Sequence, residues 1–341
     1  MLGSLHLQNF RSYKKASFEF ATTTLIIGPN TAGKTNLIEA VFLLSTGKSF
    51  KGGDEDAIMF TEEVARVSTQ GLEVVFANQA GQGRFVKKYL VNGVSKRRAD
   101  FVGNLPAVLF TPLDLELITN GPSMRRRYFD FVLEQTDSDY AHARAQYEKA
   151  IRARNRLLEE AKKRGHKSQQ IFSYWDDLLI QNGQIITQKR EEYTQYLNRF
   201  SKDVFDFTIS YDKSVISKER LLQYDRAEVD ATITLVGPHR DDFEISMFVD
   251  KEAALVKTFG SRGQQRLAIL QLKIIELAFL EEKLGERPML LLDDIFSELD
   301  EGHIDLVLEM IGKQQTILTT THKEFVKNKF SKGMHVIELG K

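Results

Sequence analysis

The chain has 341 residues with 47 basic and 47 acidic side chains, so its formal net charge is zero and global charge gives no argument for a nucleic-acid partner. Hydrophobic residues make up 42% and charged residues 28%, as in ordinary globular proteins, and no apolar run reaches the ~20 residues of a membrane helix. The absence of cysteine excludes disulfides, thiolate zinc sites and iron–sulfur clusters, and residues 1–7 lack the basic region of a secretory signal. We therefore expect a cytoplasmic protein of one large or two modest domains, with no membrane partner.

The first part of the sequence predicts strands around one helix. Residues 4–9 alternate apolar and polar side chains, and the apolar run 23–27 predicts a buried strand. A helix should follow from Lys34 to Ser45, with Gly47 as its C-cap. The further predictions here are strands within 64–95, a hairpin turn at Asn92 and Gly93, and a helix from Ser123, its N-cap, to about Glu134.

Residues 140–200 predict an antiparallel helical hairpin. A highly charged helix over 140–164 is broken at 165–167, and from Ile171 onward the apolar positions step by three and four, as on one helix face. A 25-residue helix spans roughly 38 Å, so the hairpin is a short arm. The members of the apolar stripe are Tyr174, Trp175, Leu178, Leu179, Ile185, Ile186, Tyr193, Tyr196, Leu197 and Phe200, with Asn182 as its one polar member.

The last part of the sequence predicts a parallel sheet with crossover helices. Strand patterns at 204–211, 233–236 and 243–249 precede a long apolar helix at about 264–284. Strands and helices then alternate to the last residues, which is typical of a parallel sheet. The predicted alternation is strand 289–292, helix 303–313, strand 316–321, helix 323–330 and strand 335–339.

A phosphate-binding loop is predicted at residues 28–35, which we call the phosphate loop. The sequence Gly-Pro-Asn-Thr-Ala-Gly-Lys-Thr fits the pattern G-x-x-x-x-G-K-[ST], whose glycines let backbone N–H groups turn toward phosphate oxygens. Lys34 should reach the β- and γ-phosphates of ATP, and the Thr35 hydroxyl should bind Mg²⁺. The alternative, a glycine turn with a solvated lysine, does not need the strand before and the helix after. The predicted nucleotide-binding residues are Gly28, Asn30, Gly33, Lys34, Thr35 and Asn36.

Two carboxylates follow the apolar strand at 289–292. Asp293 fits the Walker B role of holding Mg²⁺, with Thr35 as the other metal residue, and Asp294 stands where a catalytic base or water-orienting carboxylate is expected. A strand that ends in an acidic turn is common, so this motif indicates a nucleotide site only in combination with the phosphate loop.

A second phosphate-binding helix start is predicted at residues 261–264, which we call the signature loop. Small residues lead into the long apolar helix, and two such helix starts in one chain are the ABC pattern. Ser261, Gly263 and Gln264 should contact the γ-phosphate held by a second subunit. Residues 297–300 follow at D-loop spacing, and His322 ends a strand as the switch histidine does, so it is a catalytic candidate, although a lone histidine is more often a surface residue.

With these motifs, the chain resembles the RecF family of bacterial recombination-repair ATPases over nearly its whole length. This family is related to SMC proteins. The resemblance predicts an α/β fold: an ABC-type ATPase head of residues 1–135 and 205–341, with two lobes and a mixed sheet with a parallel core, and an inserted antiparallel helical arm at 136–204. The motifs that carry it are 7–13 (LQNFRSY), 33–40 (GKTNLIEA), 47–50 (GKSF), 109–112 (LFTP), 121–123 with Arg125, Arg126 and Arg127, 237–242 (GPHRDD), 261–266, and 291–294 with 297–300.

The resemblance implies ATP-dependent homodimerisation, weak DNA-stimulated ATP hydrolysis, and DNA binding by the ATP-bound dimer at gapped or single-strand/double-strand sites. It also implies work with RecR and RecO to load the recombinase RecA. Thr31 stands where the family's loop usually has glycine, which predicts a steric cost there, and Lys51 stands where arginine is common.

DNA contacts are expected on the arm. Residues 144–167 hold nine basic and three acidic side chains, a local charge of +6 in a neutral chain. The alternative is a solvated helix face with i,i+4 pairs such as Glu160–Arg164. The DNA candidates are Arg152, Arg154, Arg156, Lys162, Lys163 and Arg164.

Three other functions compete with this one. A transporter's nucleotide-binding subunit would lack a 60-residue helical arm between the phosphate loop and the signature loop. An SMC-like structural ATPase would have a longer arm, and a P-loop kinase would not need residues 261–264.

Overall fold

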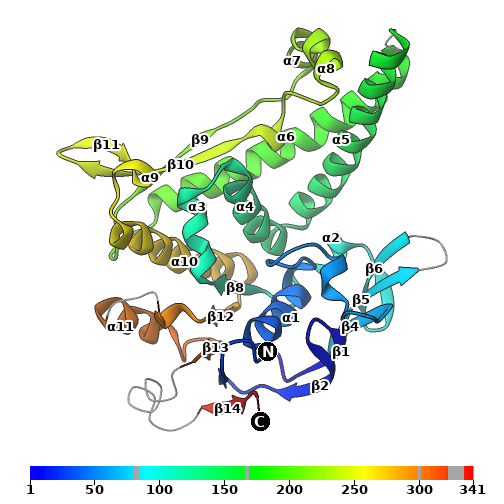
Figure 1. Ribbon diagram of the computed structural model, residues 1–341. Helices are drawn as coiled ribbons and strands as arrows, with labels where there is room; N and C mark the ends of the chain where they lie inside the picture. The colour runs from blue at the N-terminus through cyan, green and yellow to red at the C-terminus, as the bar shows by residue number, and fades with distance from the viewer. Residues whose placement is uncertain (80–83, 166–168, 298–300, 322–333, 341) are drawn as a thin grey trace. The chain divides into compact units, whose positions relative to one another are not determined.

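The computed structural model describes residues 1–79, 84–165, 169–297, 301–321 and 334–340 (Figure 1). The chain divides into two compact units: unit 1 comprises 1–114 and 276–341, and unit 2 comprises 115–275. These boundaries differ from the predicted division at 136–204, because the helical hairpin shares its unit with a small sheet and shorter helices. No helix among the described residues is long and apolar enough to cross a bilayer.

Unit 1 contains a parallel five-stranded sheet. Its strands come from both ends of the sequence: β3 (Thr23–Ile27), β8 (Ala107–Phe110), β12 (Met289–Asp293), β13 (Thr316–Thr320) and β14 (His335–Glu338). The order is β14-β3-β13-β12-β8, and every neighbouring pair is parallel, as the alternation of strands and helices predicts. The central strands are buried throughout, which explains their continuous apolar runs.

An antiparallel six-stranded sheet completes the strands of unit 1. Its members are β1 (Ser4–Phe10), β2 (Tyr13–Glu19), β4 (Val64–Thr69), β5 (Leu72–Gln79), β6 (Arg84–Val91) and β7 (Val94–Lys96), in the order β2-β1-β4-β5-β6-β7. Asn92 and Gly93 both have positive φ, as the predicted tight turn between β6 and β7 requires.

Helix α1 (Lys34–Thr46) packs against strands of both sheets and is therefore buried on almost every side. Gly47, with φ of 67°, is its left-handed C-cap, as predicted. The remaining short elements of this unit are η1 (Glu55–Ala57), α2 (Arg98–Phe101), η4 (Ile295–Ser297) and α11 (Glu301–Met310), and η2 (Pro112–Leu115) spans the unit boundary.

Unit 2 is built around the predicted helical hairpin. Helices α5 (Ser138–Arg164) and α6 (Gln169–Arg199) run side by side (Figure 1). Asn182 lies in the buried stripe of α6, as predicted, but Tyr174 is 60% exposed and Arg190 is a second buried polar member. The other helices of the unit are α3 (Glu116–Thr119), α4 (Pro122–Thr136), α7 (Lys218–Gln223), α8 (Asp225–Ala231), η3 (Pro238–Arg240) and α9 (Val256–Phe259), and α10 (Arg262–Leu284) begins here and continues into unit 1.

A three-stranded antiparallel sheet packs on the hairpin. Its order is β11 (Glu252–Leu255), β10 (Asp242–Val249), β9 (Thr208–Asp212), and Phe243 of β10 stacks on Phe129 of α4 at 3.6 Å between ring centroids. The strand predicted at 233–236 is absent: the N–H groups of Thr234 and Leu235 donate to the side chains of Asn155 and Glu228, so this segment is a loop between helices.

The start of α4 also differs from its prediction. The N-cap is Gly121, and Pro122 takes the first helical position, so Ser123 lies inside the helix. Proline at that position needs no N–H partner and is preset for the helix, which moves the start toward it.

Candidate functional site

The phosphate loop joins β3 to α1 in the predicted strand–loop–helix order. The Ala32 N–H donates to the Pro29 carbonyl at 3.2 Å, closing a turn in which Thr31 has φ of 73°. A turn with positive φ at its third position favours glycine, and a β-branched side chain is strained there. The steric cost predicted at Thr31 is thus visible in the backbone of the loop.

Lys34 holds the loop together through its side chain. Only 7% of the residue is exposed, and Nζ donates to the carbonyl oxygens of Gly28 at 2.8 Å and Pro29 at 3.0 Å. A phosphate oxygen is a stronger, charged acceptor for an ammonium group than a carbonyl is. The lysine is therefore held at the loop, in contacts that phosphate oxygens can replace.

Asp293, at the end of β12, lies beside the phosphate loop. Its Oδ1 accepts from the hydroxyl of Thr35 at 3.2 Å and from that of Thr319 at 2.8 Å. Burial raises the pKa of this carboxyl group, although both hydroxyl bonds lower it. A buried carboxylate next to a threonine hydroxyl is a set of hard oxygen donors, so Thr35 and Asp293 fit the Mg²⁺ that the sequence implies. Bound Mg²⁺ would neutralise phosphate charge.

Thr319 is a site residue that the sequence did not single out. Its hydroxyl accepts from the backbone N–H of Asp294 at 3.0 Å while donating to Asp293, so it fixes both acidic residues. Asp294 itself has left-handed backbone, with φ of 51°. Thr319 pairs with Asp293 across β12 and β13, and this register cannot be read from the local sequence pattern.

A second missed group surrounds the start of α1. Arg11 forms two bonds to the carboxylate of Glu39, at 2.6 and 3.0 Å, and donates to the Asp56 carbonyl at 2.6 Å. Glu39 is fully buried one turn after Thr35 and also accepts from the Ser49 hydroxyl. The network ties the motifs at 7–13 and 47–50 to the helix that carries the phosphate loop.

Tyr13 covers the glycine that begins α1. Its hydroxyl donates to the Gly33 carbonyl at 3.1 Å, and a Cβ atom on Gly33 would lie 2.8 Å from that hydroxyl. Burial raises the Tyr13 pKa to about 12, so the group stays a donor. Gly33 is therefore required both by its φ of 96° and by this close approach.

Asn36, predicted to bind nucleotide, lies between two polar neighbours. Its amide donates to the Ser12 hydroxyl at 3.0 Å, and its oxygen accepts from Nζ of Lys51 at 2.8 Å. Burial lowers the Lys51 pKa, while the nearby Glu39 and Asp293 raise it. Lys51 thus places a second amine close to the acidic end of β12.

The signature loop forms a capping box at the start of α10. The Ser261 hydroxyl accepts from the Gln264 N–H at 3.2 Å, and the Gln264 side chain accepts from the Ser261 N–H at 2.8 Å. Ser261, Arg262 and Gly263 remain exposed. A Cβ on Gly263 would meet only the Ser261 hydroxyl, at 3.9 Å, so packing within the chain does not require glycine there.

Comparison with known proteins identifies the family. The family model described as "RecF/RecN/SMC N terminal domain" matches residues 1–339. The chain is 33% identical to the DNA replication and repair protein RecF of Agathobacter rectalis, covering 99% of this chain and 98% of the relative, and 36% identical to that of Thermosynechococcus vestitus, covering 94% and 90%. The chain belongs to the RecF family.

Solved structures agree with the family assignment and confirm the predicted fold class. A structure of the recombination mediator protein RecF with ATP in the RecFOR pathway matches with a TM-score of 0.85 at 31% identity, covering 99% of this chain and 95% of that one. A second structure, of RecF with ATPrS in the RecFOR pathway, matches with a TM-score of 0.83 at 31% identity, covering 99% of this chain and 97% of that one. Membership of the RecF family sets aside the transporter and kinase alternatives.

The RecF-family motif at 237–242, which we call the anchor motif, holds the arm. Nη1 of Arg190 in α6 binds Asp241 and the Pro238 carbonyl at 2.8 and 2.7 Å, and Arg125 of α4 binds Asp242 through two bonds. His239 lies between the Tyr147 hydroxyl, at 2.8 Å, and the Thr234 carbonyl, at 3.0 Å. The anchor motif thus has a structural role in this RecF-family chain.

Asp130 in α4 extends this network. Burial opposes its ionisation, but the adjacent Arg144 and Arg190 lower its pKa to about 2. Arg190 lies 2.8 Å from Asp130 and Arg144 lies 3.0 Å from it. Of the three consecutive arginines marked in the sequence, Arg126 donates to the Asp241 carbonyl and Arg127 lies over the Phe131 ring.

One predicted DNA contact is wrong. Arg154 is fully buried, with Nε 2.7 Å from Asp176 and Nη2 2.6 Å from the buried Glu228. Residues two apart on a helix lie about 200° apart, so Arg154 points away from Arg152 and Arg156. Arg154 pairs one carboxylate of α6 and one of α8 in the interior of unit 2.

Four of the exposed basic residues of α5 form one stripe, which we call the basic face: Lys149, Arg152, Arg156 and Lys163. At about 100° per residue these four positions fall within about 60° of the helix circumference and extend over about 21 Å. None of them has an ion pair with a described residue. Of the other candidates, Lys162 donates to the Asp230 carbonyl and Arg164 lies 3.5 Å from Glu160.

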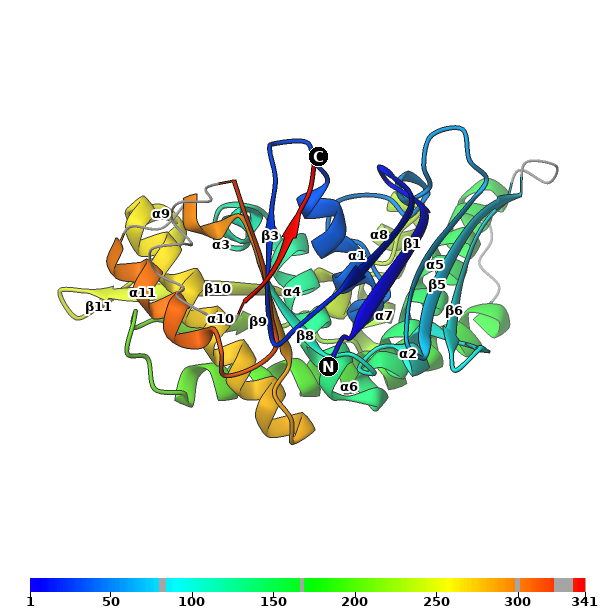
Figure 2. The same cartoon turned by 90° about the horizontal axis from the view of Figure 1, so that it is seen from below.

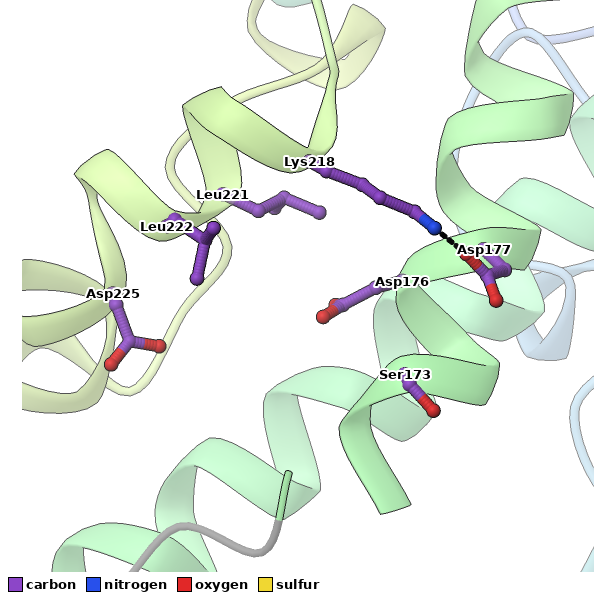
Figure 3. Close-up of a pocket in the computed structure, with 7 residues that line it drawn as sticks. All are labelled: Ser173, Asp176, Asp177, Lys218, Leu221, Leu222 and Asp225. Atoms are coloured by element: carbon purple, nitrogen blue, oxygen red, sulfur yellow. Dashed lines mark ion pairs between the residues drawn. The ribbon is translucent and has the colours of Figure 1, made fainter. Parts of the chain in front are cut away.

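The Arg154 side of the arm has the opposite charge. A cavity of about 180 Å³ between α6 and α7–α8 is lined by the carboxylates of Asp176, Asp177 and Asp225 (Figure 3). Its single ammonium, on Lys218, already lies 3.3 Å from Asp177. Asp176 pairs with Arg154 and Asp177 with Lys218, so the lining of this cavity presents no cation that lacks a carboxylate partner. The prediction of DNA contacts on the arm therefore rests on the basic face.

His322, residues 298–300 of the D-loop and Lys167 lie outside the described residues, so their predicted roles stay predictions.

Proposed function

We propose that this chain is an ATP-dependent DNA-binding protein of recombinational repair. ATP and Mg²⁺ bind at the phosphate loop, two chains then associate, and slow hydrolysis, stimulated weakly by DNA, releases them. The active form binds DNA with gaps or single-strand/double-strand junctions and works with RecR- and RecO-type mediators to load the recombinase.

The observation that carries the proposal is the pairing of Lys34, Thr35 and Asp293 around one loop. Lys34 has carbonyl acceptors that phosphate oxygens can replace, and the Thr35 hydroxyl lies 3.2 Å from the Asp293 carboxylate. Such a site binds the phosphates of a nucleotide and its metal ion. Asp294, fixed by the Thr319 hydroxyl, is the group we assign to orienting the attacking water.

The signature loop supports association of two chains. The Ser261 hydroxyl accepts one hydrogen bond as a helix cap and keeps its own proton to donate. The first turn of α10 offers further N–H groups, and Gly263 leaves room that the fold itself does not need. An exposed anion-binding terminus of this kind suits the γ-phosphate of ATP on a second copy.

Binding of ATP and association of two copies can be tested with two variants. Lys34→Ala should abolish ATP binding and dimer formation, whereas Ser261→Arg should bind ATP normally and stay monomeric. Nucleotide titration and sedimentation with and without ATP measure the two steps. Ser217→Arg is the matched control, because Ser217 caps α7 with the same bond length, 3.2 Å, away from the signature loop. A Ser261→Arg protein that dimerises with ATP would refute the composite site.

A further inference from the structure

The last strand of the sheet, β14, leads directly to the phosphate loop. It pairs in parallel with β3, from His335 opposite Thr24 to Glu338 opposite Ile27. The Leu339 N–H then donates to the Ile27 carbonyl at 2.8 Å, so pairing continues to the last residue of β3 before the loop. Figure 2 shows β14 beside β3.

Leu339 and Gly340, which follow β14, approach the first residues of the phosphate loop so closely that a side chain on Gly28 or Gly340 would be crowded. A Cβ on Gly28 would lie 2.9 Å from the Leu339 carbonyl oxygen, which is closer than real Cβ atoms come to backbone. A Cβ on Gly340, which has φ of 91°, would lie 3.2 Å from Cδ of Pro29. Leu339 and Gly340 therefore form one wall of the Gly28–Pro29 segment.

The same two loop residues hold the lysine. The carbonyls of Gly28 and Pro29 are the acceptors of Nζ of Lys34. Their positions thus depend on β14 and its extension and also decide where the lysine sits. A displacement of Leu339 and Gly340 would move the two carbonyls that position the Lys34 ammonium group, which we expect to bind phosphate.

β14 is itself held weakly. Among the described residues it is an edge strand paired on one side, and its side chains are exposed or half-buried, with Val336 47% exposed. With little apolar area buried, its docking rests mainly on ladder hydrogen bonds and on the contacts with residues 28 and 29. Strands of this kind undock locally at a lower free-energy cost than core strands.

We propose that Leu339 and Gly340 are positioning residues for the phosphate loop, and that docking of β14 and binding of ATP are thermodynamically coupled. The proposal rests on the proposed ATP site. Docking of the strand fixes Gly28 and Pro29 and favours ATP. By reciprocity, ATP favours docking by the same factor. The contacts of Leu339 and Gly340 reach Gly28, Pro29 and Ala32, whereas the orientation of the attacking water is assigned to Asp294. The coupling therefore concerns affinity and leaves the hydrolysis step unchanged.

Two glycines give a matched test. Gly340 and Gly312 have nearly the same backbone, with φ of 91° and 93°, but a Cβ on Gly312 would meet nothing within 4 Å. Gly340→Val and Gly312→Val should therefore cost similar backbone strain, and only Gly340→Val should press on Pro29. We expect KM and the dissociation constant for ATP to rise about fivefold or more in Gly340→Val, with kcat unchanged, and to stay at the wild-type values in Gly312→Val. Equal affinities in the two variants would overturn the proposal.

Hydrogen exchange on the unmodified protein tests the reciprocal effect without any risk of misfolding. The Leu339 amide and the paired amides of β14 should exchange about fivefold or more slowly with saturating ATP, and ATP should have no such effect in Lys34→Ala. Unchanged exchange in a wild-type protein that binds ATP would overturn the coupling alone. A wild-type protein that binds no ATP would instead contradict the proposed function.

Discussion

Two clusters of charged side chains in this protein are assembled from distant parts of the sequence, and they differ in the groups that accept hydrogen bonds from their cations. At the phosphate loop, Lys34 donates to two backbone carbonyls. In the arm, Arg190 faces two carboxylates, those of Asp130 and Asp241, and Arg154 faces those of Asp176 and Glu228.

This difference distinguishes the proposed ligand site at the phosphate loop from the buried ion pairs of the arm, which stabilise the fold. Carbonyl acceptors can give way to phosphate without leaving a buried charge unpaired, whereas removing an arginine from the arm leaves a carboxylate uncompensated. Substitutions at the first cluster should change ligand binding at nearly constant stability. Substitutions at the second should change stability first.

The largest effect should come from Arg154→Met. Glu228 is fully buried and would lose the guanidinium that pairs its charge, so the free energy of unfolding should fall by about 3–5 kcal/mol in urea denaturation. Arg152→Met, two residues away on the exposed face of α5, is the control and should change it by less than about 0.5 kcal/mol. Similar losses in the two variants would mean that Arg154 is not a structural arginine.

The anchor motif should also make stability depend on pH. Burial lowers the pKa of His239 from 6.5 to about 4, so between these values the unfolded chain binds more protons than the folded one. Stability should therefore be complete above about pH 6.5 and fall by about 3 kcal/mol as the pH drops to about 4. Thermal melts of His239→Gln should lack this part of the pH dependence. Parallel pH profiles for variant and wild type would exclude His239 as its source.

Neutralising the basic face should weaken DNA binding without unfolding the arm. Each lost phosphate contact lowers the slope of log K against log salt by about 0.9, so Arg152→Gln with Arg156→Gln should lower its magnitude by about 2. A control that removes two exposed charges elsewhere, Lys251→Gln with Lys283→Gln, should leave the slope in place. If the slope in Arg152→Gln with Arg156→Gln is as unchanged as in the control, DNA binds away from α5.

The smallest effect should come from relieving strain at Thr31. Thr31→Gly removes a β-branched side chain at φ of 73° and should raise the free energy of unfolding by about 1 kcal/mol while strengthening ATP binding. Thr61 has nearly the same backbone, with φ of 74°, outside the loop, so Thr61→Gly should bring only the gain in stability. Equal ATP affinities would show that strain at Thr31 does not reach the nucleotide site.

The proposed nucleotide site was largely predictable because its parts are local motifs. Strand β3, helix α1 with its Gly47 cap, and the acidic end of β12 follow from apolar pattern and glycine placement within short windows. The residues that were missed, Arg11 with Glu39 and Thr319 with Asp293, meet through sheet register and long-range packing, which a local pattern does not encode.

The arm shows the opposite balance. Its two helices follow from periodicity, but the fate of each charge depends on which side of α5 it occupies and on what packs there. Arg152 and Arg154 have similar sequence neighbours, yet Arg152 is exposed and Arg154 is fully buried against Glu228 of α8, which lies 74 residues later in the chain. Helical phase alone separates these two arginines, and only the fold identifies the buried one.

In the function proposed above, one ATP site needs the phosphate loop of one copy and the signature loop of another. The most direct test mixes Lys34→Ala protein with Ser261→Arg protein and measures ATP hydrolysis. Each variant alone should be inactive. Neither variant should pair with itself, so the dimers that form are mixed, and in each of them one of the two sites joins an intact Lys34 to an intact Ser261. The mixture should therefore recover up to about half of the wild-type rate. Full activity of Ser261→Arg alone, or no recovery in the mixture, would contradict the claim.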